Sequence, residues 1–370
     1  TVRIDPAALA ALLVNADVAH ANAAGDSVYG RTTGVGANRH VRADDSDGLH
    51  GRRLLRSHCA GAGPLLSADV GRALLIVRIN QLAKARSGIS TDVVRALVDA
   101  CNARLDPVVR RHGGIGTGDI AVLAELGLSL LGERPWADGR ISPLLAEIDA
   151  ASGLPLMSSS APTLAVAALG VHDTAAIVDA MLPVAALSAF AVRANHEAWT
   201  EAAASARVQP GVAGAATVLR RLVPGDLYVP ARLQDPFGWR TLTSVHGALL
   251  DVLDATTRVL SVDVNNSAEN PLHFEGARVH HGAFHHAALA LALDQLRLAV
   301  VQACGLSLSR LTKLQDPTMT GLRPFLADGP AGSSGVMVLE YTAASAFAEL
   351  RTLAQPSTLG TTAISLGLED

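Results

Sequence analysis

The sequence of 370 residues contains little cysteine, few aromatic side chains and few charged ones. The three cysteines, Cys59, Cys101 and Cys304, show no metal-binding spacing, and their odd number argues against a disulfide framework. A reducing, cytoplasmic location is therefore favoured. The net charge of −4 and the lack of a polybasic segment exclude the electrostatic footprint of a nucleic-acid-binding protein.

The sequence also lacks a recognisable signal peptide and an uninterrupted membrane-spanning segment. The most apolar stretch, 163–192, contains His172, Asp173 and Asp179, whereas a spanning helix needs about 18 apolar residues. We therefore expect no membrane partner. Because 49% of the residues are hydrophobic, the chain has either a very well-buried interior or helices that are shared between subunits.

Alternating strand patterns are scarce, whereas long segments of alanine, leucine and valine are frequent. These segments predict helices at 6–23, 46–58, 65–86, 89–104, 119–132, 143–151, 162–193, 211–222, 240–260, 284–313 and 334–354. The segment 287–306 is apolar almost all round, which predicts a helix buried on every side. The fold class is therefore mostly α, a bundle of long helices whose loops carry the functional residues.

The predicted helices divide the chain into a loop-rich N-terminal region at 1–160 and a central bundle at 161–370, within one continuous unit. The sequence ends at Leu-Glu-Asp, directly after a helix and a short loop. It is therefore expected to be either a short form or part of a longer chain.

Five loop segments carry a recognisable combination of residues. They are YGRTTGVG (29–36), SHCAG with RINQLAKARSG (57–61 and 78–88), GGIGTGD (113–119), QDPFGWR (234–240), and VNNSAENPL with HGAFHH (264–272 and 281–286). In this order and spacing, they resemble the histidine and aromatic amino-acid ammonia-lyases and aminomutases. The resemblance implies an amino-acid substrate and a homotetramer whose active sites are shared between subunits. It also implies that the bundle at 161–370 forms the helical core of this oligomer. Relatives carry a further helical C-terminal portion, which is short or absent here.

Tyr29 matches the base that removes the β-proton in this family. A free phenol has a pKa near 10, so a base that works near neutral pH needs about 3–4 kcal/mol of phenolate stabilisation. Taken alone, YGRTTGVG is equally a tyrosine packed in a glycine-rich turn.

The family forms its electrophile, methylidene-imidazolone, from Ala-Ser-Gly, and this chain has Gly116-Thr117-Gly118 at that place. Cyclisation needs a flexible backbone, an amide nucleophile and a β-hydroxyl group, and this tripeptide has all three. Threonine would yield a methyl-substituted ring, more crowded at the electrophilic carbon. The alternative is that Thr117 and Asp119 only cap the helix at 119–131.

Other positions both keep and change the family pattern. Arg240 resembles the residue that binds the substrate carboxylate, and its planar fork suits that role. Asn265, Asn270 and Phe284 match the loops around the electrophile. Ser158 stands where relatives have the asparagine that supports the electrophile, Phe237 replaces a tyrosine, and Ala283 replaces an asparagine.

The substrate is indicated by two residues. His58 matches the position at which relatives that accept polar rings have histidine, and Glu369 resembles the glutamate that histidine lyases direct at the imidazole. Taken alone, His58 is equally a helix-end histidine bonded to a carbonyl group. His280, His281 and His286 lack the spacing of a metal site, so we expect neither a metal nor a nucleotide cofactor.

Three functions follow as hypotheses. The first is an ammonia-lyase or 2,3-aminomutase acting on a polar α-amino acid. The second is a lyase or cyclase of the same fold that works without the ring. The third is a catalytically degenerate partner subunit of an active lyase, against which the retained Tyr29 and Arg240 argue.

Overall fold

A computed structural model of the chain describes residues 1–23, 27–114, 118–360 and 364–368. Gly116, Thr117 and Glu369 of the candidate site lie outside the described residues. The chain folds into two compact units. The first consists of 1–170, 260–287 and 360–370, and the second of 171–259 and 288–359. The first unit thus contains two later segments that the sequence-based division assigned to the bundle.

The first unit is built from short helices and two small antiparallel sheets. Its helices are α1 (Pro6–Ala21), α2 (His50–His58), α3 (Ala68–Leu82), α4 (Thr91–Asn102), α5 (Ile120–Leu130) and α6 (Ala150–Met157), with 3-10 turns η1 (Gly36–Asn38) and η4 (Ser365–Gly367). Strand β1 (Ala62–Leu65) pairs with β2 (Arg110–His112), and β3 (Leu272–Phe274) forms a hairpin with β4 (Ala277–Val279).

Helix α5 lies at the centre of the first unit. Every residue from Ala121 to Leu130 is buried, because α2, α4 and α6 all pack against this helix. A helix that is apolar on all sides is stable only when it is surrounded in this way. The start of α5 is therefore held in the core of the first unit.

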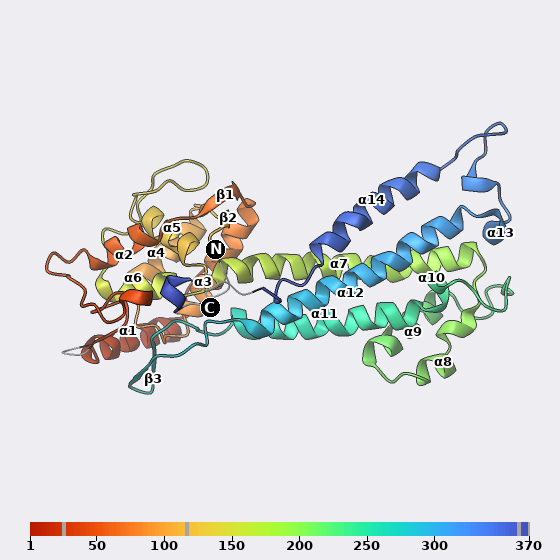
Figure 1. Ribbon diagram of the computed structural model, residues 1–370. Helices are drawn as coiled ribbons and strands as arrows, with labels where there is room; N and C mark the ends of the chain where they lie inside the picture. The colour runs from red at the N-terminus through yellow and green to blue at the C-terminus, as the bar shows by residue number, and fades with distance from the viewer. Residues whose placement is uncertain (24–26, 115–117, 361–363, 369–370) are drawn as a thin grey trace. The chain divides into compact units, whose positions relative to one another are not determined.

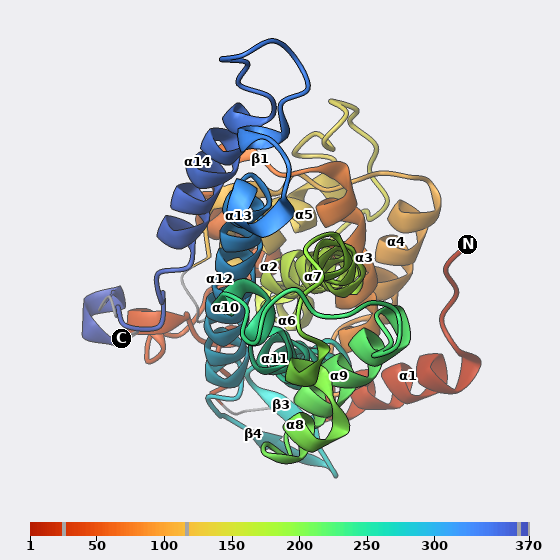
Figure 2. The ribbon, with the colours of Figure 1, turned by 90° about the vertical axis from the view of Figure 1, so that its right-hand side faces the viewer.

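The second unit is dominated by long helices. Its elements are most of α7 (Ala161–Ala191), α11 (Leu242–Val264) and α12 (Ala287–Leu314), together with η2 (His196–Trp199), α8 (Glu201–Ser205), α9 (Pro210–Leu222), α10 (Phe237–Arg240), α13 (Pro317–Thr320), η3 (Pro324–Leu326) and α14 (Met337–Leu353). Figures 1 and 2 show α7, α11 and α12 running alongside one another in this unit. The prediction of a mostly α fold built from long helices is confirmed.

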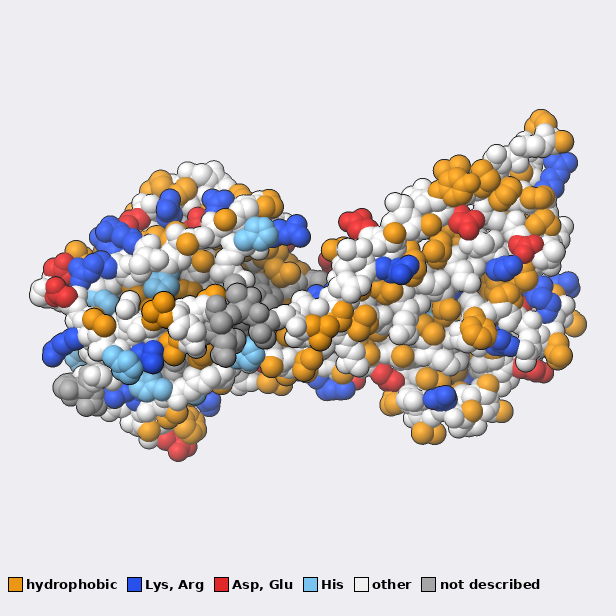
Figure 3. Space-filling model, viewed as in Figure 1, with side chains coloured by type: hydrophobic (Ala, Val, Ile, Leu, Met, Phe, Trp, Pro, Cys, Tyr) orange, Lys and Arg blue, Asp and Glu red, His pale blue; other side chains and the backbone are white. Residues whose placement is uncertain are grey.

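The apolar faces of the long helices are not covered within one chain. Leu291 and Leu298 of α12 are exposed, and α14 has no buried residue although it carries Val338 and Leu339. Figure 3 shows apolar side chains spread over the visible face of this unit. The prediction that 287–306 is buried on every side is therefore wrong for the single chain. Of the two explanations for the high hydrophobicity, helices shared between subunits fit this unit better.

Two helical stretches, 150–191 and 287–314, are long and apolar enough to cross a membrane by length and composition. This corrects the expectation from the sequence, because one histidine and two aspartates interrupt 163–192 too little to lower its mean hydropathy below that of a span. Core helices of soluble proteins meet the same criterion, so the finding is weak evidence for a membrane protein.

One predicted helix is misplaced. Residues 143–149 are not helical, and helix α6 begins at Ala150 instead. The backbone N–H groups of Leu144 and Leu145 both donate to the carbonyl of Leu130 and so close the end of α5. Pro155 lies inside α6, whereas a proline ordinarily indicates the end of a helix.

Candidate functional site

A cavity of about 500 Å³ in the first unit collects half of the twelve predicted site residues. Six of them line it, and they come from stretches far apart in the sequence: Tyr29, His58, Gly118, Ser158, Asn270 and Phe284. The first residues of α5, Ile120 and Ala121, line it as well. The first turn of the buried helix α5 therefore forms part of the cavity wall.

Tyr29 is held by a tight turn. Gly30 adopts φ +69, and a Cβ atom there would lie 2.2 Å from Cδ2 of Leu154, so only glycine fits after the tyrosine. The phenolic oxygen of Tyr29 accepts a hydrogen bond from the backbone N–H of Gly36 at 2.8 Å. A donor aimed at this oxygen stabilises negative charge on it, as a phenolate base requires.

His58 is the last residue of α2. Its Nδ1 lies 2.8 Å from the carbonyl oxygen of Leu54, and a carbonyl can only accept, so Nδ1 carries the proton. Nε2 is then left as a hydrogen-bond acceptor on a ring that lines the cavity. The helix-end interpretation of His58 is thus confirmed, and the same bond fixes the tautomer.

Gly118 and Asp119 join the glycine-rich loop to α5. Gly118 has φ +141, which strongly favours glycine. The carboxylate of the buried Asp119 makes no capping bond to α5. It instead accepts the backbone N–H of Thr163 at 2.8 Å and the Thr163 hydroxyl at 3.1 Å, and so caps the start of α7. Asp119 thus occupies the N-cap position of α5, but the alternative interpretation, in which its side chain only caps this helix, is wrong. Burial raises the pKa of Asp119, and the bonds from Thr163 oppose this effect.

Ser158 and Asn270 meet across the cavity wall. The backbone N–H of Asn270 donates to Oγ of Ser158 at 3.1 Å, and Oδ1 of Asn270 accepts the backbone N–H of His281 at 3.0 Å. The ring of Phe284 lies 6.4 Å from that of His281. The segment 281–284 therefore packs next to Asn270, to which it is hydrogen-bonded through His281.

Asn265 is not among the residues that line the cavity. Its Nδ2 donates to the carbonyl of Ser261 at 2.8 Å, and its Oδ1 accepts from Asn80 at 3.1 Å. The side chain of Asn265 thus bonds to the last turn of α11 and to Asn80 of α3.

Arg240 and Phe237 belong to the second unit. The Arg240 guanidinium carbon lies 4.6 Å from the centroid of the Phe237 ring, and Nη1 donates to Oε1 of Gln234. Phe237 is 62% exposed. The indole of Trp239 donates to Ser188 at 3.0 Å, and the carbonyl of Gly238 accepts from Arg310 at 3.1 Å. Trp239 and Gly238 thus anchor the segment, and the half-buried Arg240 stacks on the exposed ring of Phe237.

A second cavity of about 420 Å³ shares Tyr29, Asn270 and Phe284 with the first. Arg39, His40 and His280 also line it. Burial, together with the charge of Arg278, lowers the pKa of His280. This side of Tyr29 therefore offers polar and cationic groups.

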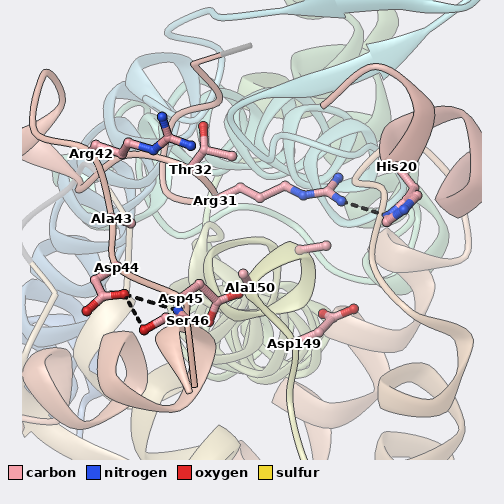
Figure 4. A pocket seen from close by; sticks show the side chains of 11 residues that line it. His20, Arg31, Thr32, Arg42, Ala43, Asp44, Asp45, Ser46, Asp149 and Ala150 are labelled. Atoms are coloured by element: carbon pink, nitrogen blue, oxygen red, sulfur yellow. Dashed lines mark hydrogen bonds between the residues drawn. The ribbon is translucent and has the colours of Figure 1, made fainter. Parts of the chain in front are cut away.

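A third cavity, of about 540 Å³, contains none of the predicted site residues. Figure 4 shows Arg31 directed at His20, at 3.0 Å, and Asp44 bonded to Ser46. Both acidic and basic side chains line it, Asp149 and Arg42 among them. This mixture selects no single class of ligand.

Sequence reasoning missed a buried polar cluster behind the first cavity. Arg78 and Glu269 are 0% and 1% exposed and form an ion pair at 2.6 Å. Gln81 accepts from both Arg78, at 3.0 Å, and Ser159, at 2.7 Å. The available signal was an arginine and a glutamine one helical turn apart in the otherwise apolar part of 68–82. Within the described residues, no group of three or more His, Cys, Asp or Glu side chains could hold a metal.

Comparisons with known proteins identify the family to which the chain belongs. The sequence model described as aromatic amino acid lyase matches residues 1–370. Histidine ammonia-lyase of Symbiobacterium thermophilum is 34% identical over 363 residues, covering 93% of this chain and 71% of that protein. Histidine ammonia-lyase of Stigmatella aurantiaca is 32% identical, covering 100% and 77%.

Solved structures show the same fold. Ergothionase of Treponema denticola, an ergothioneine-degrading enzyme solved with desmethyl-ergothioneine sulfonic acid, aligns with a TM-score of 0.91 at 26% identity, covering 100% of this chain and 78% of that one. Tyrosine aminomutase of Streptomyces globisporus aligns with a TM-score of 0.89 at 25% identity, with the same coverage. The chain therefore belongs to the aromatic amino acid lyase family and is an enzyme of its ammonia-lyase and aminomutase class, which acts on carbon–nitrogen bonds.

Proposed function

We propose that the chain is a cytoplasmic ammonia-lyase or 2,3-aminomutase that acts on a polar, histidine-like α-amino acid, with Tyr29 as the base. The observation that carries this proposal is the shared cavity of Tyr29, His58 and Gly118 at the start of α5. The base, the side-chain-selecting residue and the edge of the electrophile loop all face one space large enough for an amino acid.

The described flanks of the loop fit a ring formed from Gly116-Thr117-Gly118. The φ value of +141 at Gly118 strongly favours glycine, and a Cβ at Gly114 would lie 2.1 Å from Oδ1 of Asp119. When formed, the methyl-substituted imidazolone supplies an electrophile for the amino group. The backbone N–H groups of Ile120 and Ala121 at the start of α5 favour negative charge that develops next to the loop.

The substrate class is argued from hydrogen-bonding capacity. Since Nδ1 of His58 is used by Leu54, Nε2 accepts a bond from a substrate N–H or O–H group. Arg39, His40 and His280 on the other side of Tyr29 also suit a polar substrate. The relatives named histidine ammonia-lyase support an imidazole side chain.

The assembly in this proposal is a homotetramer that completes each site. Arg240 would reach the substrate carboxylate from a neighbouring subunit, with Phe237 holding its guanidinium group flat. The uncovered apolar residues of α12 and α14 support burial against further copies of the chain.

The first test measures the intact mass of the purified protein. Ring formation removes two water molecules, so the chain should be about 36 Da lighter than its sequence mass. The Thr117→Ala variant should show the full mass and lose the imidazolone absorbance. A panel of amino acids, with histidine first, is then assayed for ammonia and for the unsaturated acid, and β-amino acid products would identify a mutase.

A second candidate, favoured by the changes at Gly116, Ser158 and Ala283, is a lyase that does not use the ring. Its substrate would carry a leaving group that departs without covalent capture. Full mass combined with turnover that depends on Tyr29 would establish it. Full mass without turnover would indicate a degenerate partner subunit.

A further inference from the structure

Three residues of the cavity wall are each next to a buried polar residue in the sequence. Gly118, Ser158 and Asn270 line the cavity, and each is followed or preceded directly by a buried polar residue. These neighbours are Asp119, Ser159 and Glu269. Each cavity residue therefore lies next to a residue that is fixed in the interior of the first unit.

The three interior residues belong to one hydrogen-bonded cluster around Arg78 of α3. Glu269 forms the ion pair with Arg78, with 2.6 Å between Nη1 and Oε1, and its other oxygen accepts from Ser267 at 2.5 Å. Ser159 donates to Gln81 at 2.7 Å. The backbone N–H of Asp119 donates to the carbonyl of Ser159 at 2.9 Å.

The guanidinium group of Arg78 also fixes the end of α6. Its Nε donates to the carbonyl of Leu156 at 3.2 Å, and its Nη2 donates to the carbonyl of Pro155. Carbonyls in the last turn of a helix have no partner further along that helix. Arg78 supplies these partners one turn before Ser158, so it holds the Ser158 loop and the Asn270 loop at once.

We propose that Arg78 and Glu269 are positioning residues, which set the distances between Gly118, Ser158 and Asn270 around the proposed electrophile loop. This role rests on the proposed function, because it assigns a catalytic purpose to the geometry of that cavity. A fully buried arginine and carboxylate are expensive to desolvate and stabilise a fold little compared with apolar residues of the same size. The planar guanidinium group, however, directs its donors to Glu269, to Gln81 and to the end of α6, and so defines the relative placement of these loops.

The main test variant is Glu269→Asp, which keeps the charge and shortens the side chain by one methylene group. Gln81→Met is the second variant, because it leaves the ion pair intact and removes the bonds that Gln81 accepts from Arg78 and Ser159. The matched control is Asp106→Glu. Asp106 pairs at 2.7 Å with Arg72, which lies in α3 as Arg78 does. The control therefore changes the length of a carboxylate side chain and keeps its charge, at a position away from the cavity.

Two readouts are made on the full chain at a temperature at which circular dichroism shows every variant folded. Hydrogen exchange is followed by mass spectrometry in peptides that cover 118–123, 156–160 and 267–272. Turnover of the amino acid found with the wild type gives kcat and KM. We expect faster exchange in these peptides for Glu269→Asp and Gln81→Met. We also expect kcat to fall about 10- to 100-fold, because misplacement by about 1 Å can cost that much, while KM stays within about threefold.

Faster exchange with wild-type kcat would overturn the proposal, because the cluster would then be structural only. Wild-type exchange in both variants would overturn it as well, and so would equal losses of kcat in Asp106→Glu. If the wild type turns over none of the amino acids, the proposed function fails. The exchange data then still decide whether the cluster fixes the three loops.

Discussion

The two units each bury an arginine beneath a segment with candidate site residues, and the two arginines are compensated differently. Arg78 in the first unit is paired with Glu269. Arg310 in the second unit is 3% exposed, and its bonds to the described residues reach only the Gly238 carbonyl and the Ser307 hydroxyl. Burial lowers the pKa of Arg310 to about 10.

The difference shows what each unit does for the proposed site. The first unit fixes its cavity with a complete polar network, so its geometry is set within one chain. The second unit holds the half-buried Arg240 on an anchored segment and contains helices with uncovered apolar faces. Changes in the first unit should therefore act on chemistry, whereas changes inside the second should act on stability or on assembly.

The largest effect is expected for Tyr29→Phe. Loss of the proposed base should lower kcat about 1,000-fold, whereas loss of the hydrogen bond from Gly36 should change the free energy of unfolding by about 1 kcal/mol. Steady-state assays and denaturant melts measure the two quantities, and the intact mass should match that of the wild type apart from the substituted oxygen. Retained turnover would remove Tyr29 from the role of base.

The next effect concerns stability and lies in the second unit. His246 is 1% exposed, both ring nitrogens lack partners among the described residues, and burial beside Arg310 lowers its pKa to about 4. In the unfolded chain a histidine binds a proton below about pH 6.5, whereas His246 in the folded chain remains neutral down to about pH 4. The protein should therefore lose stability as the pH falls through this window, by up to about 3 kcal/mol.

The variant His246→Phe should lack this part of the pH dependence. Urea melts of both proteins from pH 7.5 to 4.5 should give curves that converge at high pH and separate as the pH falls, with the variant more stable. His40→Gln, a change of an exposed histidine, is the control and should leave the slope unaltered. Parallel curves for the wild type and His246→Phe would contradict the prediction, because the pKa of His246 would then not be lowered in the folded protein.

The sequence predicts the local features of this fold better than the non-local ones. Apolar runs located α5 and α7 to within a few residues, because burial on all sides leaves a continuous signal along the chain. Of the site residues that the motifs predicted, six line one cavity, namely Tyr29, His58, Gly118, Ser158, Asn270 and Phe284, whereas Asn265, Phe237 and Arg240 do not.

Non-local bonds explain what sequence reasoning missed. Asp119 precedes α5, and the alternative interpretation had it cap this helix, yet its carboxylate bonds to Thr163 at the start of α7, 44 positions away. Arg78 and Glu269 are separated by 191 positions, and no local pattern joins them. The start of α6 was misplaced because Leu144 and Leu145 bond to the end of α5 instead of starting a helix.

A smaller effect is expected for Arg240→Met, which tests whether the two units meet in the assembly. Loss of the carboxylate clamp should lower kcat/KM about 100-fold. If each site takes Tyr29 from one subunit and Arg240 from another, mixed tetramers of Tyr29→Phe and Arg240→Met contain some intact sites. Unfolding and refolding the two inactive variants together should therefore restore part of the activity, and refolding each alone should not. Failure of mixtures that do form hybrid tetramers would place both residues in one subunit's site.

The smallest effect is expected for His58→Phe, which tests the hydrogen-bond logic of the cavity. Because Nε2 of His58 is the acceptor, its removal should lower kcat/KM about 10-fold for a substrate with an imidazole N–H or a phenol O–H. An apolar aromatic amino acid should lose nothing or gain. The preferred measurement is competition between the two substrates in one reaction, since this ratio is independent of the fraction of active enzyme. An equal loss for both substrates would show that His58 supports the end of α2 through its Leu54 bond and does not select the side chain.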